Sequence, residues 1–364
     1  MKKALHINSY FLTNKIHYNL YRRLKQIKND QFLIPVYKRF KDNHIDGVDV
    51  DYIFNSFDKK VFFTKIPKVI LLFYKKKYKD FAFFHAHTVI SDGLPAYLLH
   101  LMTGKPYVTS VRNTDISLFI NGSVIFRYLA KLIISRAKAV FFISPSLRYK
   151  IEERYPQINR ANFYMLPNGL DDYWRANTAE KKSRSLQLPI VKLLFVGELI
   201  ERKNLKVLID FLKTYNDYNY ELHIVGKNTD NVDFAELRNT IQVNNKIVYH
   251  GPLYDKEELR KIYLLCDVFV LLSHAETFGV VYIEALSQGL PIIYTRGEGL
   301  DGFFHEGEVG YSCDNKNLSE LHDKLSRVID NYQSISINAL EASKNFHWDN
   351  IVNDYLSVLN KQLG

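Results

Sequence analysis

The sequence predicts a parallel α/β protein built from two doubly wound domains. Short apolar runs rich in Val, Ile and Phe recur along the chain, with helix-length segments between them. This alternation is typical of parallel strands that are buried on both faces of a sheet. A polar segment around residues 170–190 carries Pro189 and precedes a new strand-like run, so it marks the join between two such domains.

The expected strands fall into two groups of five. Those of the first half are Ala4–Ile7, Phe32–Val36, Phe81–His85, Tyr107–Val111 and Ala139–Ile143. Those of the second half are Lys192–Val196, Glu221–Val225, Lys246–Tyr249, Val268–Leu272 and Pro291–Tyr294, and helices are expected over Leu318–Asn331 and Trp348–Leu359. We therefore expect domains over residues 1–175 and 176–345, and a C-terminal helix within 346–364 that packs near the junction. Ligands bind beyond the carboxyl ends of parallel strands, so the two domains are expected to face each other across a cleft.

Composition excludes several classes of protein. With 364 residues, 47% apolar and 24% charged, the chain is long and apolar enough for two cores and is not disordered. Its two cysteines are too few for a disulfide framework. The start MKKALHINSYF lacks the apolar core of a signal peptide, and the most apolar stretch, residues 124–143, contains four Lys or Arg side chains. We expect a cytoplasmic protein without a spanning helix.

The charge is concentrated in the first half of the chain. Residues 1–175 contain 29 Lys and Arg against 13 Asp and Glu, whereas residues 176–364 contain 20 against 26. The basic segments Lys75–Lys79 and Lys131–Lys138 lie among Tyr, Phe, Leu and Ile, a mixture that suits an anionic membrane surface. The alternative is that they are solvated helix faces. No nucleic-acid motif accompanies the charge, so no nucleic-acid partner is expected.

The segment from Leu271 to Ile293 carries the densest set of candidate site residues. Glu276 and Glu284 stand eight residues apart, and a helix is expected from about Phe278 to Gln288. Backbone N–H groups at its start form a candidate anion site, contributed by Thr277, Phe278, Gly279 and Val280. The two carboxylates would accept hydrogen bonds from sugar hydroxyls. Alternatively, Glu276 only stabilises the helix N-terminus and Glu284 is a solvated residue.

The first expected strand is followed by NSYFLTNK, which lacks the G-x-G-x-x-G fingerprint of redox dinucleotide binding, and Walker A, H-E-x-x-H and G-x-S-x-G motifs are missing from the sequence. The E-x7-E spacing followed by ALSQGLP instead resembles the motif of the GT-B glycosyltransferases of family 4. Further blocks resemble that family in its order along the chain: HAHTVISDGLPAYLLHLMTGKPYV, FFISPSLRYKI with PNGLDD, FVGELIERKN and GEGLDGFFHEGEVGYSC. The resemblance covers nearly the whole chain and implies the GT-B fold, with two Rossmann-like domains.

The resemblance implies a role for each matching residue of the second domain. Glu284 would hold the donor ribose, and Glu276 would bind hydroxyls of the transferred sugar. Lys203 would neutralise the diphosphate in the loop that follows Gly197, which suits a leaving group that gains negative charge. The family has an Arg directly after this Gly, where Glu198 stands here, so Arg202 is expected to supply the missing cation.

In the first domain the sequence departs from the family pattern at two loops. The usual Gly pair after the first strand is replaced by Leu12-Thr13-Asn14-Lys15, so Lys15 would contact phosphate by charge, and Asn14 would face acceptor or sugar. The usual His-Gly-Ser-Asp is replaced by Arg112-Asn113-Thr114-Asp115. Arg112 is permanently charged and cannot act as a base, but it can bind a phosphate or a hydroxyl, and Asp115 is a candidate sugar contact.

The histidines His85 and His87 close an expected strand with one residue between them, and we expect them to point to opposite faces. The resemblance makes His87 a candidate contact for the acceptor or donor sugar, although a core or capping role is equally open. Metal binding by the pair is not expected. Asp49-Val50-Asp51 resembles a metal-holding pair, but no clear strand precedes it, and we interpret it as surface. Neither metal nor cofactor is expected.

Together these features predict a metal-independent hexosyl- or N-acetylhexosaminyl-transferase, and the resemblance to family 4 implies that it retains the anomeric configuration. It would move a sugar from a nucleotide sugar to a saccharide acceptor, lipid-linked, in the assembly of bacterial capsule, O-antigen or exopolysaccharide. The enzyme would lie on the inner face of the plasma membrane. The alternatives are a nucleotide-sugar epimerase or a non-enzymatic sugar-binding protein on the same pair of domains.

Overall fold

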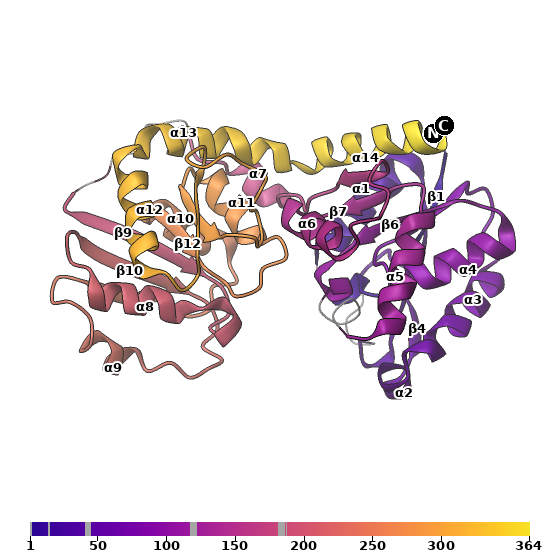
Figure 1. Cartoon of the computed structure of the whole chain (residues 1–364), viewed down its shortest axis with the longest axis horizontal. Coiled ribbons are helices and arrows are strands. Elements are labelled where there is room, and N and C mark those ends of the chain that lie inside the picture. The colour runs from indigo at the N-terminus through magenta and orange to yellow at the C-terminus, as the bar shows by residue number, and fades with distance from the viewer. Residues whose placement is uncertain (1, 14, 41–44, 117–121, 181–185, 187) are drawn as a thin grey trace. The chain divides into compact units, whose positions relative to one another are not determined.

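The computed structural model describes all residues except 1, 14, 41–44, 117–121, 181–185 and 187. The chain divides into two compact units (Figure 1). The first comprises residues 1–143, 147–167 and 348–364, and the second comprises 144–146 and 168–347. The contacts thus assign residues 168–175, expected in the first domain, to the second unit. There Trp174 is buried, with its indole 5.3 Å from the ring of Tyr263.

The first unit is built on a six-stranded parallel sheet in the order β2-β1-β5-β6-β7-β8. Its strands are β1 (Ala4–Ile7), β2 (Gln31–Leu33), β5 (Phe83–Ala86), β6 (Tyr107–Val111), β7 (Val140–Phe142) and β8 (Phe163–Met165). A separate parallel pair joins β3 (Pro35–Tyr37) to β4 (Asp51–Phe54). The single strand expected over Phe32–Val36 is therefore divided between β2 and β3. Asp51, expected at the surface, begins β4.

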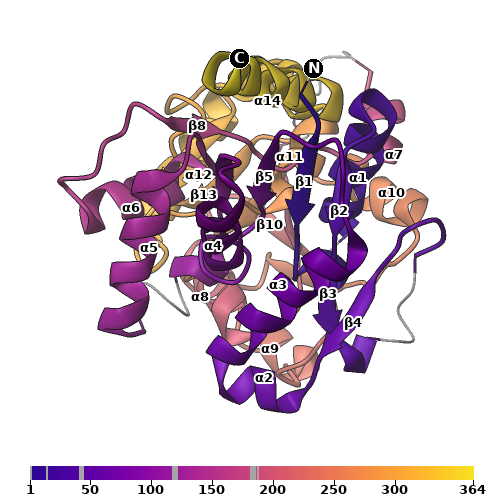
Figure 2. The same ribbon diagram turned by 90° about the vertical axis from the view of Figure 1, so that its right-hand side faces the viewer.

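Helices cover both faces of this sheet. One face packs against α3 (Lys65–Lys76), α4 (Gly93–Thr103) and α5 (Val124–Arg136), which lie side by side in Figure 2. The other packs against α1 (Lys15–Lys28) and the C-terminal helix α14 (Trp348–Leu363). The short helix α2 (Ser56–Lys60) precedes α3, and α6 (Pro145–Arg154) follows β7. The polypeptide thus returns to the first unit to complete its core.

The second unit repeats this architecture. Its parallel sheet has the order β11-β10-β9-β12-β13-β14, formed by β9 (Ile190–Val196), β10 (Asn219–Val225), β11 (Lys246–Tyr249), β12 (Val268–Leu271), β13 (Ile292–Thr295) and β14 (Gly310–Cys313). Its helices are α7 (Asp172–Ala176), α8 (Leu205–Thr214), α9 (Phe234–Arg238), α10 (Lys256–Leu265), α11 (Val280–Ser287), α12 (Leu318–Asp330) and α13 (Tyr332–Ser343). No helix of the described residues is long and apolar enough to cross a membrane.

Both sheets reverse their strand order at one point. In the first unit the reversal lies between β1 and β5, and in the second between β9 and β12. Loops that leave the carboxyl ends of such neighbouring strands diverge to opposite faces and open a crevice between them, where ligands of α/β proteins bind. The candidate residues of each unit must therefore be sought after these four strands.

Candidate functional site

In the second unit, an ion pair joins the loops that follow β9 and β12. Lys203 Nζ lies 2.5 Å from Glu276 Oε2, and the two side chains are only 15% and 10% exposed. The loops are also tied together by Asn204, whose left-handed backbone directs its side-chain amide to the carbonyl oxygens of Leu272 and Asn315, at 2.9 and 2.8 Å. Two residues predicted to act on the same donor thus meet at the switch point, 73 positions apart in sequence.

Glu276 is fixed by its own backbone. Its N–H donates to Glu298 Oε2 at 3.0 Å, and its carbonyl accepts from the N–H of Gly299 at 2.8 Å. Beside it, Gly279 has a φ of 75°, and a Cβ built there would lie 2.4 Å from the ring of Tyr282. Only glycine fits this turn without displacing a buried tyrosine, so the turn and the carboxylate are held as one rigid element.

The predicted anion site at the start of the helix is smaller than expected. The helix α11 begins at Val280, not at Phe278. The N–H of Thr277 donates to Glu276 Oε1 at 3.2 Å, so it is already used. Phe278 is buried, with its ring edge-on to Phe303 and Phe346, and can offer a ligand only its backbone.

The remaining cation of this loop lies close to the ion pair. Arg202 donates from a guanidinium nitrogen to the carbonyl oxygen of Ala275 at 2.7 Å, directly before Glu276. Glu198, whose charge conflicts with a phosphate site, accepts a hydrogen bond from Thr229 Oγ1 at 2.7 Å. Gly197 directly follows β9, and its N–H donates to the carbonyl oxygen of Val225 at 2.9 Å. The loop therefore presents two cations beside Glu276 while Glu198 is engaged by another loop.

Glu284 lies two turns further along, on α11. Tyr263 donates its hydroxyl proton to Glu284 Oε2 at 3.2 Å, and Trp174 also hydrogen-bonds to the carboxylate. Burial raises the pKa of Glu284 to about 7, because the charged form loses hydration. Tyr263 and Trp174 come from α10 and α7, and no sequence motif pointed to either. A carboxyl group with this pKa changes its charge near neutral pH.

In the first unit, Asp115 is buried and holds two loops together. Its oxygens accept the backbone N–H groups of Val89, Ile90 and Arg112 at 2.9, 3.1 and 2.9 Å. Burial raises its pKa to about 7. With both oxygens occupied and no exposed surface, Asp115 is placed to shape the loops after β5 and β6 and not to face a sugar. Arg112 is half-buried, and burial lowers its pKa to about 10, so it keeps its charge at neutral pH.

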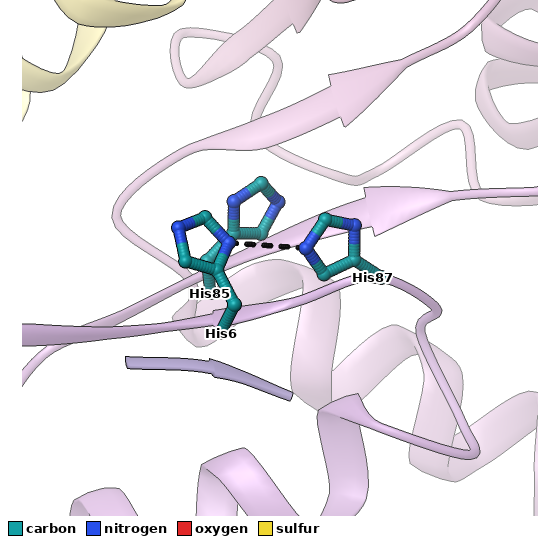
Figure 3. Close-up of side chains that lie close together, drawn as sticks. All are labelled: His6, His85 and His87. Carbon is teal, nitrogen blue, oxygen red and sulfur yellow. Dashed lines mark hydrogen bonds between the residues drawn. The ribbon is translucent and has the colours of Figure 1, made fainter. Parts of the chain in front are cut away.

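His85 and His87 form a buried cluster of three with His6 of β1 (Figure 3). The expectation that His85 and His87 point to opposite faces is wrong. Their rings stack at 4.5 Å with an interplanar angle of 13°, because alternate residues of an extended chain share a face. His6, which sequence reasoning missed, could have been found from the same alternation, since it lies beside His85 in the parallel register. Lys15 begins α1, and Asn14 lies outside the described residues.

Two sheets with one strand-order reversal each, and site loops at both reversals, define the two-domain GT-B fold of glycosyltransferases, as predicted. Solved structures with this fold cover the whole molecule. The lipopolysaccharide outer core galactosyltransferase WaaB has a TM-score of 0.75 at 16% identity and covers 100% of both chains. Anabaena HepE, solved with UDP, has a TM-score of 0.69 at 16% identity over 99% of this chain and 100% of its own.

Sequence comparison finds a family similar to the second unit. Residues 178–345 match the model of the family Glycosyl transferases group 1. An uncharacterized glycosyltransferase of Methanocaldococcus jannaschii is 24% identical over 345 residues, which are 92% of this chain and 90% of the relative. The matched residues include Lys203, Glu276, Glu284 and Tyr263, whereas Trp174 lies just before them.

Proposed function

We propose that this protein is a glycosyltransferase that uses a nucleotide sugar as its donor. The observation that supports this best is the Lys203–Glu276 pair at the switch point of the unit whose residues match a glycosyltransferase family. A cation and a carboxylate held side by side match the two ends of such a donor, because its diphosphate is anionic and its sugar carries hydroxyl donors. HepE, which has the same fold, was solved with UDP and glucose and with UDP-glucose.

The geometry supports a separate role in donor binding for each of four residues: Arg202, Lys203, Glu276 and Glu284. Lys203 and Arg202 would bind the diphosphate and stabilise the charge that develops as the glycosidic bond breaks. Donor binding would replace the Lys203–Glu276 contact and free Glu276 to accept sugar hydroxyls, while Glu284 would hold the ribose. Two cations at the phosphates make a metal unnecessary. Transfer with retention of configuration, as in the family that the sequence resembles, is part of this proposal.

The acceptor side of the proposal rests on the surface of the first unit. Exposed residues of α3 and α5 include both apolar and cationic side chains, among them Leu71, Tyr74, Lys75, Val124, Ile125, Tyr128 and Lys131. We call this set the basic apolar face. No Asp or Glu occurs in residues 59–79, and Asp115, which is buried, is the only one in residues 93–151. Such a surface suits an anionic bilayer and therefore a lipid-linked saccharide acceptor on the cytoplasmic side of the membrane.

A thermal-shift titration tests the donor part of the proposal. Purified protein is heated with UDP-, GDP-, ADP- and dTDP-sugars, first with EDTA and then with Mg²⁺. A donor at 100 times its Kd adds about 2.7 kcal/mol of stability and raises the melting temperature. We expect one nucleotide class to stabilise the protein in EDTA. Glu284→Ala should abolish that shift, since the ribose loses its carboxylate.

The matched control is Asp330→Ala, which removes an exposed carboxylate at the last residue of α12 in the same unit. It should leave the shift unchanged. A wild-type protein that no nucleotide sugar stabilises would contradict the proposed function. A shift that needs Mg²⁺ would contradict metal independence alone.

A further inference from the structure

A chain of buried hydrogen bonds runs from Asp30 through His6 to His87. Asp30 Oδ2 lies 3.2 Å from His6 Nε2, and His6 Nδ1 lies 3.0 Å from His87 Nε2. None of the three side chains is more than 3% exposed. His6 is further clamped by Phe32, whose ring stacks on it at 4.5 Å. The three side chains are therefore held in one arrangement, and the ring protons of the two histidines can be assigned from their hydrogen-bond partners.

The direction of each hydrogen bond is set by the carboxylate. Asp30 Oδ1 accepts the N–H of Ala4 at 2.8 Å, and Lys28 Nζ lies 3.7 Å from Oδ2, so Asp30 is charged and can only accept. Burial opposes ionisation, but the hydrogen bond with His6, together with the contacts to Lys28 and Ala4, holds the pKa of Asp30 below its usual value. His6 must donate from Nε2. Burial lowers the pKa of both His6 and His87, so each is neutral and carries one ring proton.

The consequence reaches the far nitrogen of His87. His6 uses its proton on Asp30, so its Nδ1 is a bare acceptor and His87 must donate from Nε2. The Nδ1 of His87 is then a bare acceptor too. This nitrogen is buried and has no hydrogen-bond partner among the described residues. A buried acceptor without a partner is costly, and a hydroxyl group could satisfy it.

The position of this nitrogen is that of a ligand contact. His87 directly follows β5, at the strand-order reversal of the first sheet, and its N–H donates to Ile7 of β1 at 3.1 Å. Arg112 is close enough to lower the pKa of His87, and the ring of His17 stands edge-on to it at 6.1 Å. The acceptor nitrogen thus lies among the residues that follow β1, β5 and β6.

The same cluster could be read as a metal site, since ligand atoms of His6, His85 and His87 lie within 4.8 Å of one another. The observed hydrogen bonds favour the chain from Asp30 through His6 to His87 over a metal site. His85 has both nitrogens engaged, Nδ1 with Tyr355 at 2.7 Å and Nε2 with Ser110 at 2.9 Å. His6 has both engaged as well. A metal would have to replace these bonds.

We propose that Asp30 and His6 are positioning residues that fix His87 as a hydrogen-bond acceptor for a hydroxyl of a sugar substrate. The sugar part rests on the proposed function. The hydroxyl could belong to the donor sugar or to the acceptor saccharide, which present the same group. The hydrogen-bond chain itself depends only on the three residues, so it can be tested without any substrate.

The first test reads the ring nitrogens of His87 by NMR in protein labelled with ¹⁵N-histidine, where the His87→Gln spectrum assigns the signals. The wild type should carry its proton on Nε2 and none on Nδ1. In Asp30→Asn, the amide oxygen can keep the N–H of Ala4, while the amide nitrogen donates to His6 Nε2. Both histidines should then reverse, leaving the proton of His87 on Nδ1.

Lys28→Met is the control, because it removes a neighbouring charge and keeps the carboxylate, so the tautomers should not change. A wild-type His87 protonated on Nδ1 would overturn the proposal without any variant. So would an unchanged tautomer in folded Asp30→Asn, or one equivalent of tightly bound zinc.

The second test is a double-mutant cycle with UDP-glucose and UDP as probes, followed by steady-state transfer assays. Asp30→Asn and His87→Gln should each lower kcat/KM about tenfold, the scale of one net hydrogen bond. Their combination should be no worse than either alone, because Asp30 acts through His87. If the two substitutions lower kcat/KM by factors that multiply in the double variant, Asp30 only supports the fold. That result would overturn the proposal that it acts through His87.

The two probes locate the hydroxyl. If it belongs to the donor sugar, His87→Gln weakens UDP-glucose and not UDP; if it belongs to the acceptor, only the acceptor KM rises. Unaltered affinity, kcat and acceptor KM in His87→Gln would overturn the sugar contact. If no nucleotide sugar binds the wild type, the proposed function fails. The NMR spectra still decide whether Asp30 and His6 fix the protonated ring nitrogen of His87.

Discussion

At the scale of single residues, Glu284 makes donor binding depend on pH. Its carboxyl group has a pKa of about 7 and is surrounded by Tyr263 of α10, Trp174 of α7, Lys256 and Asp171. The charged form accepts strong hydrogen bonds at both oxygens, whereas the protonated form uses one oxygen as a donor. If the ribose binds there, the Kd for UDP-glucose should fall about tenfold between pH 6 and pH 8, since roughly a tenth of the groups are ionised one unit below the pKa.

Titration calorimetry across this pH range measures the effect, and Glu284→Gln provides the comparison because it keeps the shape and cannot ionise. Its Kd should be weaker and independent of pH. Ionisation of Glu284 has the opposite effect on the stability of the fold. A raised pKa means that the folded protein holds the proton more tightly than the unfolded chain does, so this group's contribution to the free energy of unfolding falls between about pH 4.5 and 7. A wild-type Kd that does not change with pH would remove Glu284 from the ribose site.

At the scale of elements, the turn before α11 depends on Gly279. An alanine there must adopt a φ of 75° and also places its Cβ 2.4 Å from the ring of Tyr282. That ring cannot move easily, because Tyr282 is buried and donates its hydroxyl proton to the carbonyl oxygen of Leu271 at 2.6 Å. We expect Gly279→Ala to lower both the free energy of unfolding and the affinity for the donor.

Gly297 supplies the matched control for that prediction. It lies in the same unit, has a φ of 76°, and a Cβ there would meet nothing within 4 Å. Both variants bear the cost of left-handed backbone, about 1–2 kcal/mol, so their difference isolates the clash. Urea unfolding should show Gly279→Ala to be about 1–3 kcal/mol less stable than Gly297→Ala. Equal stability of the two variants would mean that the turn yields without strain.

The strands also show how much of the fold the sequence predicts. Short runs rich in β-branched and aromatic residues, such as Tyr107–Val111 and Lys246–Tyr249, predict β6 and β11 to the residue, because such side chains favour extended backbone. Two edge strands, β8 and β14, were not predicted. Both are short, and β14 contains Gly310 and Ser312, so neither resembles a buried strand.

The residues of the candidate sites divide in the same way. Glu276 and Glu284 were found because their spacing is local to one segment. Asp30, Tyr263 and Trp174 were not, because each meets its partner only after the sheet has assembled: Asp30 reaches back from the loop after α1 to His6 of β1. The error at His85 and His87 was one of strand geometry. A residue that acts through a tertiary hydrogen bond leaves no spacing pattern in the sequence.

At the scale of the whole molecule, the uneven charge and the basic apolar face predict where the protein works. Each Lys or Arg near an anionic surface contributes about 1 kcal/mol, and the exposed apolar side chains add burial in the interface. Val124, Ile125 and Tyr128 are 69%, 62% and 67% exposed on the first two turns of α5. We expect the protein to sediment with vesicles that contain phosphatidylglycerol, and less with purely zwitterionic vesicles.

The variant Ile125→Glu separates specific docking from general cation attraction. It places a carboxylate on the basic apolar face, where the anionic lipid would repel it and its apolar contact is lost. The control Val243→Glu changes the net charge by the same amount at a residue of the second unit that is 91% exposed. If the face docks, Ile125→Glu should sediment several-fold less and Val243→Glu as the wild type does. Equal losses would mean that net charge alone drives association, and no association with anionic vesicles would leave the acceptor to be sought among soluble saccharides.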